Sequence, residues 1–152
     1  MMSMAENEIN GVINQDHLGR KTDYLYRLSI KALIRNDKGD VLVVKETGRT
    51  WWDLPGGGMD HGETIKQAIA RELYEEVRLR GDFTYRIIAI EDPSLLQNAK
   101  VLQVRIIFEV VPENMSFESG EDGDEVMFID ALKLKDSENH SERNVYEYSL
   151  KS

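Results

Sequence analysis

The segment of residues 64 to 79 limits most strongly what this chain can fold into, because it contains neither glycine nor proline. Apolar residues recur in it at every fourth position: Ile65, Ile69, Leu73 and Val77. This spacing places them on one face of an α-helix and predicts an amphipathic helix that packs against a core. Thr64 can cap the start of this helix, and Gly81 can end it.

Strand patterns precede the predicted helix. Residues 25 to 34 alternate between polar and apolar side chains, which is the period of a β-strand. The apolar side chains on one side of this strand are Leu28, Ile30, Ala32 and Ile34. Residues 36 to 40 have the composition of a turn, and residues 41 to 45 form a second apolar run. We therefore expect these two strands to pair as a hairpin.

Further strands are expected on both sides of the helix. A short one would lie near residues 52 to 54, before Pro55 and the glycines at positions 56 to 58 turn the chain into a loop. β-Branched residues predict three more strands, at residues 85 to 90, 101 to 111 and 126 to 129. Residues 131 to 152 contain two candidate helical pieces. Strands interspersed with one long helix predict an α/β domain with a mixed sheet.

Length and composition predict one compact domain. The chain has 152 residues, 41% hydrophobic and 31% charged, which is typical of a globular protein. Residues 1–22 are polar and have no hydrophobic period, so we expect a flexible N-terminal arm there and the domain at residues 23–152. No run approaches the ~20 apolar residues of a membrane span, and the start has no features of a secretory signal. We expect a cytoplasmic protein that does not bind membranes.

Charge and cysteine content exclude several kinds of site. The chain has no cysteine, which excludes disulfides, thiolate metal sites and thiol nucleophiles. Its net charge is −9, which argues against binding duplex nucleic acid, because such binding relies on many contacts between basic side chains and phosphates. Any metal ion must therefore be held by oxygen or histidine ligands.

Three glutamates gather on one face of the predicted helix. At 100° per residue, Glu72, Glu75 and Glu76 fall within an arc of about 100°. Like charges this close repel one another unless a cation lies among them, and carboxylate oxygens suit Mg²⁺ or Mn²⁺ better than zinc. Since Mg²⁺ commonly binds through carboxylates together with substrate phosphates, a phosphate ester or anhydride is the implied ligand. The alternative is an ordinary solvated helix face.

The residues around these glutamates follow the pattern G-x5-E-x7-R-E-U-x-E-E-x-G-U, where U is a bulky aliphatic residue. The matching residues are Gly57, Glu63, Arg71, Glu72, Leu73, Glu75, Glu76 and Leu79. This pattern resembles the Nudix box, and TWWDLPGG at residues 50 to 57 looks like the segment that leads into it. The resemblance implies the Nudix fold, an α/β/α sandwich with a mixed β-sheet. One position departs from the box, because Arg78 replaces its glycine; we expect Gly81 to end the helix instead, which would change helix length more than chemistry.

The resemblance also implies an activity and the residues that perform it. A Nudix hydrolase uses Mg²⁺, or Mn²⁺, to cut a phosphoanhydride of a nucleoside diphosphate derivative by attack of water. The metal ligands would be Glu72, Glu75, Glu76 and the carbonyl of Gly56. Glu72 would take the proton from water, and Arg71 would orient the glutamates through a bidentate salt bridge, so Glu72, Arg71 and Glu75 are the expected catalytic residues.

Residues outside this group receive supporting roles. Glu63 would brace the loop before the helix, and it is not expected to bind metal. Family members often recruit another acidic residue from the loop before the last strand, here residues 118–125, and counting back from that strand favours Glu121 as a further metal ligand. Lys45 and Arg49 precede the box and could contact substrate phosphates.

The sequence leaves the substrate open. The main alternative activity is that of an ADP-ribose or nucleotide-sugar pyrophosphatase. A non-catalytic regulator that binds nucleotides is an alternative of another class, against which the retention of all four glutamates of the box argues. Trp51 and Trp52 could stack on a base, although Trp52 is expected to pack under the sheet. The expected partner is a small-molecule nucleotide, and a homodimer is compatible with the sequence.

Overall fold

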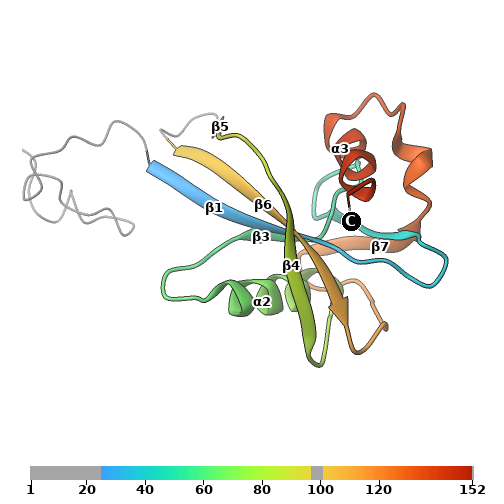
Figure 1. Ribbon diagram of the computed structural model, residues 1–152, viewed down its shortest axis with the longest axis horizontal. Coiled ribbons are helices and arrows are strands. Elements are labelled where there is room, and N and C mark those ends of the chain that lie inside the picture. The colour runs from blue at the N-terminus through green and yellow to red at the C-terminus, as the bar shows by residue number, and fades with distance from the viewer. Residues whose placement is uncertain (1–24, 97–100, 152) are drawn as a thin grey trace, which may run out of the picture.

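The computed structural model describes residues 25–96 and 101–151, so the arm predicted at residues 1–22 lies outside the described residues (Figure 1). The elements are β1 (Leu25–Leu33), β2 (Val41–Glu46), β3 (Gly56–Gly58), α2 (Ile65–Val77), β4 (Phe83–Ile90), β5 (Ser94–Leu96), β6 (Val101–Pro112), β7 (Gly123–Ile129), the 3-10 helix η3 (Ala131–Leu134) and α3 (His140–Ser149). The predicted α/β fold is confirmed.

The strands form two sheets. The larger sheet has the order β3-β1-β6-β4, and β5 also pairs with β6. Within it, β1 and β6 run parallel, while β3, β4 and β5 pair antiparallel with their neighbours, so the sheet is mixed as predicted. The smaller sheet consists of β2 and β7, which pair antiparallel.

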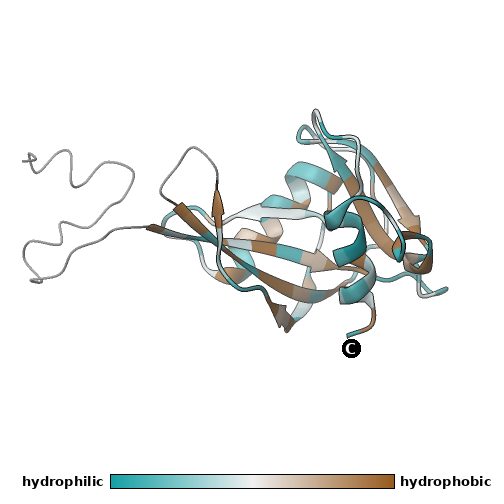
Figure 2. Ribbon diagram, turned by 90° about the horizontal axis from the view of Figure 1, so that it is seen from above, coloured by the Kyte–Doolittle hydropathy of each residue, from teal (hydrophilic) through white to brown (hydrophobic). Residues whose placement is uncertain are grey.

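Helices cover both sides of the strands (Figure 1), and two hydrophobic clusters fill the resulting layers. Along β1 and β2, alternate side chains pack in one hydrophobic cluster and in the other. Ile30 and Leu42 pack with the apolar face of α2, whereas Leu33 and Val43 pack with η3 and α3. Figure 2 shows that hydrophobic residues concentrate in the strands that form this central layer. The result is the α/β/α sandwich that the sequence predicts.

The predicted hairpin of the first two strands is wrong. β1 is an inner strand whose two edges are occupied by β3 and β6, so no edge remains for β2. The two strands meet only beside their connecting turn, where Arg35 forms an isolated bridge with Val41. The turn itself is present at residues 36 to 40, but it carries the chain from one sheet to the other.

The glycine run was expected to be a loop, and the structure makes it strand β3. Its partner is the middle of β1, with Ile30 opposite Gly57 and Lys31 opposite Gly56. The strand expected at residues 52 to 54 is reduced to one bridge, between Asp53 and Val44 of β2. β5 was not predicted, and its three residues are too few for a recognisable period.

Helix α2 begins where the sequence predicts and ends earlier than predicted. Thr64 is its N-cap, and a capping box with Gln67 satisfies the first backbone groups. The helix stops at Val77, and Arg78 takes the left-handed conformation, with φ 56° and ψ 37°. Gly81 therefore does not end it. Arg78 adopts the backbone conformation for which glycine is usually selected at this position.

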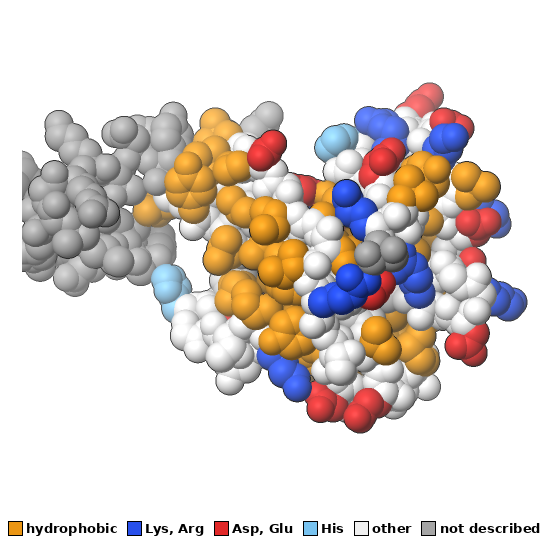
Figure 3. Space-filling view, in the orientation of Figure 1, with side chains coloured by type: hydrophobic (Ala, Val, Ile, Leu, Met, Phe, Trp, Pro, Cys, Tyr) orange, Lys and Arg blue, Asp and Glu red, His pale blue; other side chains and the backbone are white. Residues whose placement is uncertain are grey.

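The outer part of the large sheet has an apolar surface. Figure 3 shows hydrophobic side chains gathered over this part of the molecule. Exposed members on β1, β4 and β5 are Tyr26, Leu28, Ile87, Ile90 and Leu95. None of the helices in the described part of the chain is long and apolar enough to cross a membrane.

Candidate active site

The glycines of β3 bring the backbone close to both β1 and α2. A Cβ atom on Gly56 would lie 2.0 Å from the carbonyl oxygen of Ile30, and the φ angle of Gly56 is +139°. A Cβ atom on Gly57 would lie 2.6 Å from Oε2 of Glu72. Glycine at position 56 therefore lets β3 lie close to β1, and glycine at position 57 leaves room for the carboxylate of Glu72 against the strand.

Glu72, Glu75 and Glu76, which we call the carboxylate patch, lie on one face of α2 as their spacing predicts. Glu72 and Glu76 are buried, and the side chain of Glu75 is 36% exposed. The backbone N–H of Gly56 donates a hydrogen bond of 2.9 Å to Oε2 of Glu76. The patch therefore has a buried side against β3 and an open side at Glu75.

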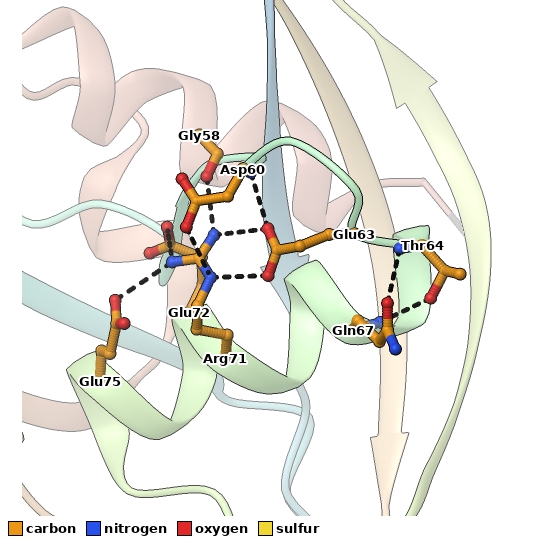
Figure 4. A network of polar contacts seen from close by, with 8 residues as sticks. All are labelled: Gly58, Asp60, Glu63, Thr64, Gln67, Arg71, Glu72 and Glu75. Carbon is orange, nitrogen blue, oxygen red and sulfur yellow. Dashed lines mark hydrogen bonds and ion pairs between the residues drawn. The ribbon is translucent and has the colours of Figure 1, made fainter.

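Arg71 connects the patch to the loop before the helix (Figure 4). Its Nε and Nη2 atoms donate to the two carboxylate oxygens of Glu63, at 2.7 and 2.9 Å. Its Nη1 atom donates to Glu72 at 2.9 Å and to Glu75 at 3.3 Å, and Nη2 also bonds the carbonyl of Gly58. The bidentate salt bridge predicted for Arg71 is thus made with Glu63, while the patch receives single hydrogen bonds.

Glu63 braces the loop, as expected from the sequence. Besides its bidentate pair with Arg71, it accepts a hydrogen bond of 2.7 Å from the backbone N–H of Asp60. The hydrogen bond from Arg71 is the main cause that lowers the pKa of Glu63 to about 2. All its described polar contacts serve the loop and Arg71, so Glu63 is a supporting residue of the site.

Burial disfavours the charged forms of Glu72 and Glu76 when no cation is close to them. Burial raises the pKa of Glu76 to about 8, although Lys31 and the hydrogen bond from Gly56 act in the opposite direction. Burial likewise raises the pKa of Glu72, against the lowering effect of Arg71. A positive ion close to these oxygens would therefore stabilise their charged forms.

The donor set has the chemistry that a hard divalent ion requires. The patch and the carbonyl of Gly56 supply only oxygen atoms, which suits Mg²⁺ or Mn²⁺. Within residues 25–96 and 101–151, no group of three acidic or histidine side chains is already clustered as a metal site. Arg71 bonds Oε1 of Glu72 and Oε2 of Glu75, so the second oxygen of each carboxylate lies outside this salt bridge.

Lys31 is a buried residue of the site that was not among the expected ones. Its Nζ atom donates to the carbonyl oxygens of Leu54 and Gly56, at 3.1 and 3.2 Å. It also lies 3.3 Å from a carboxylate oxygen of Glu46 and 3.3 Å from one of Asp53. The available sequence signal was a lysine inside an otherwise apolar run, residues 30 to 34.

The expected substrate-binding residues lie on β2 and just after it, Lys45 within the strand and Arg49 three residues beyond its end. Nζ of Lys45 is 4.5 Å from the centre of the Trp52 ring and 3.7 Å from Glu125. Arg49 lies over the ring of Trp51 and forms an ion pair of 2.7 Å with Glu46. Trp52 is partly buried against the hydrophobic cluster beside α3, in agreement with its expected packing. Both basic groups thus sit on aromatic rings near the segment that leads into β3.

The acidic segment predicted as a loop at residues 118–125 lies against the end of α2, but its residues from Gly123 on already belong to β7. Its backbone N–H groups donate to helix carbonyls, from Gly120 to Glu76 at 2.9 Å and from Asp122 to Glu75 at 3.3 Å. Glu121 is 84% exposed and forms an ion pair of 3.9 Å with Arg78. The loop is therefore attached to the helix that carries the patch, although the side chain of Glu121 contacts Arg78 in this structure.

The sequence is similar to known proteins over most of the described residues. Residues 25–148 match the profile of the NUDIX domain. The RNA pyrophosphohydrolase of Vibrio atlanticus is 50% identical over 54 residues, which cover 36% of this chain and 31% of that protein. The RNA pyrophosphohydrolase of Vibrio cholerae is 48% identical over the same length and also matches over 31% of its own chain. The similarity to these curated relatives is confined to that part of them.

Solved structures share the fold over most of the chain. The MutT protein of Methanosarcina mazei is 25% identical, with a TM-score of 0.67, over 85% of this chain and 96% of that one. An ADP-ribose pyrophosphatase of Streptococcus suis is 20% identical, with a TM-score of 0.52, over 82% of this chain and 87% of that one. At this identity, the second likeness concerns the fold alone.

Proposed function

The chain belongs to the NUDIX domain family, and from this premise we propose that it hydrolyses a phosphoanhydride bond in a nucleoside diphosphate derivative, such as a nucleoside triphosphate. The observation that carries the proposal is the carboxylate patch, which α2 holds against the backbone of β3 and Arg71 holds in place. The similarity to RNA pyrophosphohydrolases and to a MutT protein supports this chemistry.

Each group of the site has a part in the proposed reaction. Glu72, Glu75, Glu76 and the carbonyl of Gly56 would hold a divalent ion, Mg²⁺ or Mn²⁺. When bound, such an ion neutralises charge on the bridging oxygens and lowers the pKa of an attacking water. Glu72 would accept the proton of the attacking water, a role that burial favours because it raises the pKa of this carboxyl.

Neighbouring side chains position these groups. Arg71 orients Glu72 and Glu75 through its Nη1 atom, and its pairing with Glu63 fixes the guanidinium. Lys45 and Arg49 supply positive charge for substrate phosphates, and Glu121 contributes a further carboxylate from the acidic loop. Lys45 lies over the ring of Trp52, and Arg49 lies over the ring of Trp51. A phosphate bound by the cation and a base stacked on the ring would therefore lie next to each other.

The bond chemistry of the site suits more than one class of substrate. An ADP-ribose or nucleotide-sugar pyrophosphatase uses the same bond chemistry, and the likeness to one such enzyme concerns the fold alone. RNA with a 5′-triphosphate contains the same anhydride, but the net charge of −9 disfavours extended contacts with nucleic acid. A small nucleotide is therefore the expected substrate.

A phosphate-release screen tests activity and substrate together. Nucleoside triphosphates, ADP-ribose, nucleotide sugars, dinucleotides and 5′-triphosphorylated RNA are supplied with Mg²⁺. We expect Glu76→Gln to lower turnover at least ~100-fold with the fold intact. The site would lose a metal ligand, and with it the positive charge of the ion at the transition state. Glu147→Gln, an exposed change on α3, is the matched control and should leave turnover unchanged. No release from any compound, or full activity of Glu76→Gln in saturating Mg²⁺, would contradict the proposal.

A further inference from the structure

Lys31 is surrounded by oxygen atoms in the way that a bound cation is. The residue is 4% exposed, and its ammonium group contacts two backbone carbonyls and two carboxylates. The carbonyls come from Leu54 and Gly56, directly before and within β3, and the carboxylates from Glu46 and Asp53. An uncompensated lysine in such a position would be strongly unfavourable, so the surrounding oxygens hold it as an ion.

The charge of Lys31 is secured by its neighbours. Burial alone would lower the pKa of Lys31, but the carboxylate of Asp53, followed by those of Glu76 and Glu46, raises it further than burial lowers it. Asp53 Oδ2 has no hydrogen-bond partner in the described structure, and the ammonium 3.3 Å away supplies its charge compensation. Two carboxylates and two backbone carbonyls thus surround the ammonium group of Lys31.

The peptide groups of Gly56 link this charge to the carboxylate patch. The N–H of Gly56 donates to Glu76, and the carbonyl of the same residue accepts from Lys31. The carbonyl of Gly56 is also the backbone ligand expected for the divalent ion. An ion held by this oxygen would be a close neighbour of the ammonium group, which already donates to it. Two cations would then share one buried carbonyl oxygen.

We propose that Lys31 is a resident cation of the site: it pairs with the carboxylates of Glu46 and Asp53 and takes one side of the carbonyl oxygen of Gly56, and thereby confines divalent ions to the other side of that oxygen, with Glu72, Glu75 and Glu76. The proposal rests on the proposed function and adds to it a limit on how many divalent ions the chain binds. Lys31 acts through the oxygens that it occupies, so it is a positioning residue.

Titration of the metal-free protein with Mn²⁺ alone, followed by calorimetry, tests this role. Lys31→Met removes the charge and keeps the length of the side chain. We expect this variant to bind one more Mn²⁺ per chain than the wild type, or to bind Mn²⁺ at least ~10-fold more tightly. Lys31→Arg, which keeps the charge, should restore the wild-type stoichiometry. Lys133→Met, at an exposed position, should bind Mn²⁺ as the wild type does.

Loss of Lys31 leaves Asp53 unpaired, so a second variant guards against misfolding. Lys31→Met combined with Asp53→Asn removes both buried charges and keeps an oxygen ligand at position 53; it should show the same gain of Mn²⁺ binding. Equal stoichiometry and affinity in the wild type and in both variants without the lysine would overturn the resident cation and leave the proposed hydrolase intact. A wild-type protein that binds no Mn²⁺ would contradict the proposed function itself.

Discussion

Glu76→Gln is expected to make the metal-free protein more stable at neutral and alkaline pH while it abolishes activity. The reason is the burial of this side chain, which is 4% exposed and whose pKa is raised to about 8 from an ordinary value of 4.5. A glutamate with a raised pKa holds its proton more tightly in the folded chain than in the unfolded chain. Its stabilising contribution is complete below pH 4.5 and is lost as the pH rises through 8.

The size of the effect follows from the two pKa values. Each pH unit between them lowers the free energy of unfolding by about 1.4 kcal/mol. The ionisable side chain of Glu76 thus costs roughly 3 kcal/mol at pH 7 and roughly 5 kcal/mol at pH 9, against a total stability of about 5–15 kcal/mol for a domain. Glutamine keeps an oxygen that can accept from the N–H of Gly56 and carries no charge.

Urea unfolding followed by circular dichroism measures this difference. The wild type, Glu76→Gln and the control Glu75→Gln are compared in EDTA at pH 5, 7 and 9. The control changes the same chemical group on the same helix face, at a side chain that is 36% exposed. We expect the wild type and Glu76→Gln to diverge with rising pH and the wild type and Glu75→Gln to stay parallel. Parallel curves for wild type and Glu76→Gln would refute the reasoning.

Three other substitutions probe the ends and the support of the patch. Arg78→Gly should raise the melting temperature by about 2–4 °C, because it relieves a left-handed backbone that costs about 1 kcal/mol, and it should change turnover less than ~10-fold. Arg71→Lys should lower turnover at least ~10-fold in a kinetic assay, because lysine cannot make the bidentate contact with Glu63. Glu121→Gln should weaken Mn²⁺ binding, whereas Glu118→Gln should not; equal affinities and turnover in both variants and the wild type would remove Glu121 from the site.

The carboxylate patch could be predicted because its geometry is local. Once residues 65 to 77 form a helix, the spacing of the three glutamates fixes their common face without reference to the rest of the chain. The same holds for the N-cap at Thr64, which depends on Gln67 three positions later. The spacing along the helix does not by itself predict the contact between Arg71 and Glu63, because this contact also depends on how the preceding loop folds back onto the helix.

The errors concern contacts between distant segments. Whether β1 and β2 form a hairpin depends on β3 and β6, which compete for the edges of β1, and no local pattern reveals that competition. The glycines at positions 56 to 58 have the composition of a loop, and they form a strand because β1 offers them an edge at very close approach. Arg78 is a different case: its backbone N–H bonds the carbonyls of Leu73 and Tyr74 at the end of the helix, in a left-handed conformation that the residue type disfavours.

The two cations of the site have different partners. Arg71 holds Glu63, Glu72 and Glu75 at the open side, and Lys31 lies beside Glu76 at the buried side. The carboxylates outnumber these cations, so the folded chain retains uncompensated negative charge where α2 meets β3. That excess is unfavourable for the metal-free fold, as the raised pKa of Glu76 reflects, and it is the feature that would draw a divalent ion to the patch. Stability and the proposed activity therefore make opposite demands on Glu76: a neutral side chain suits the empty fold, and only a charged one suits the metal.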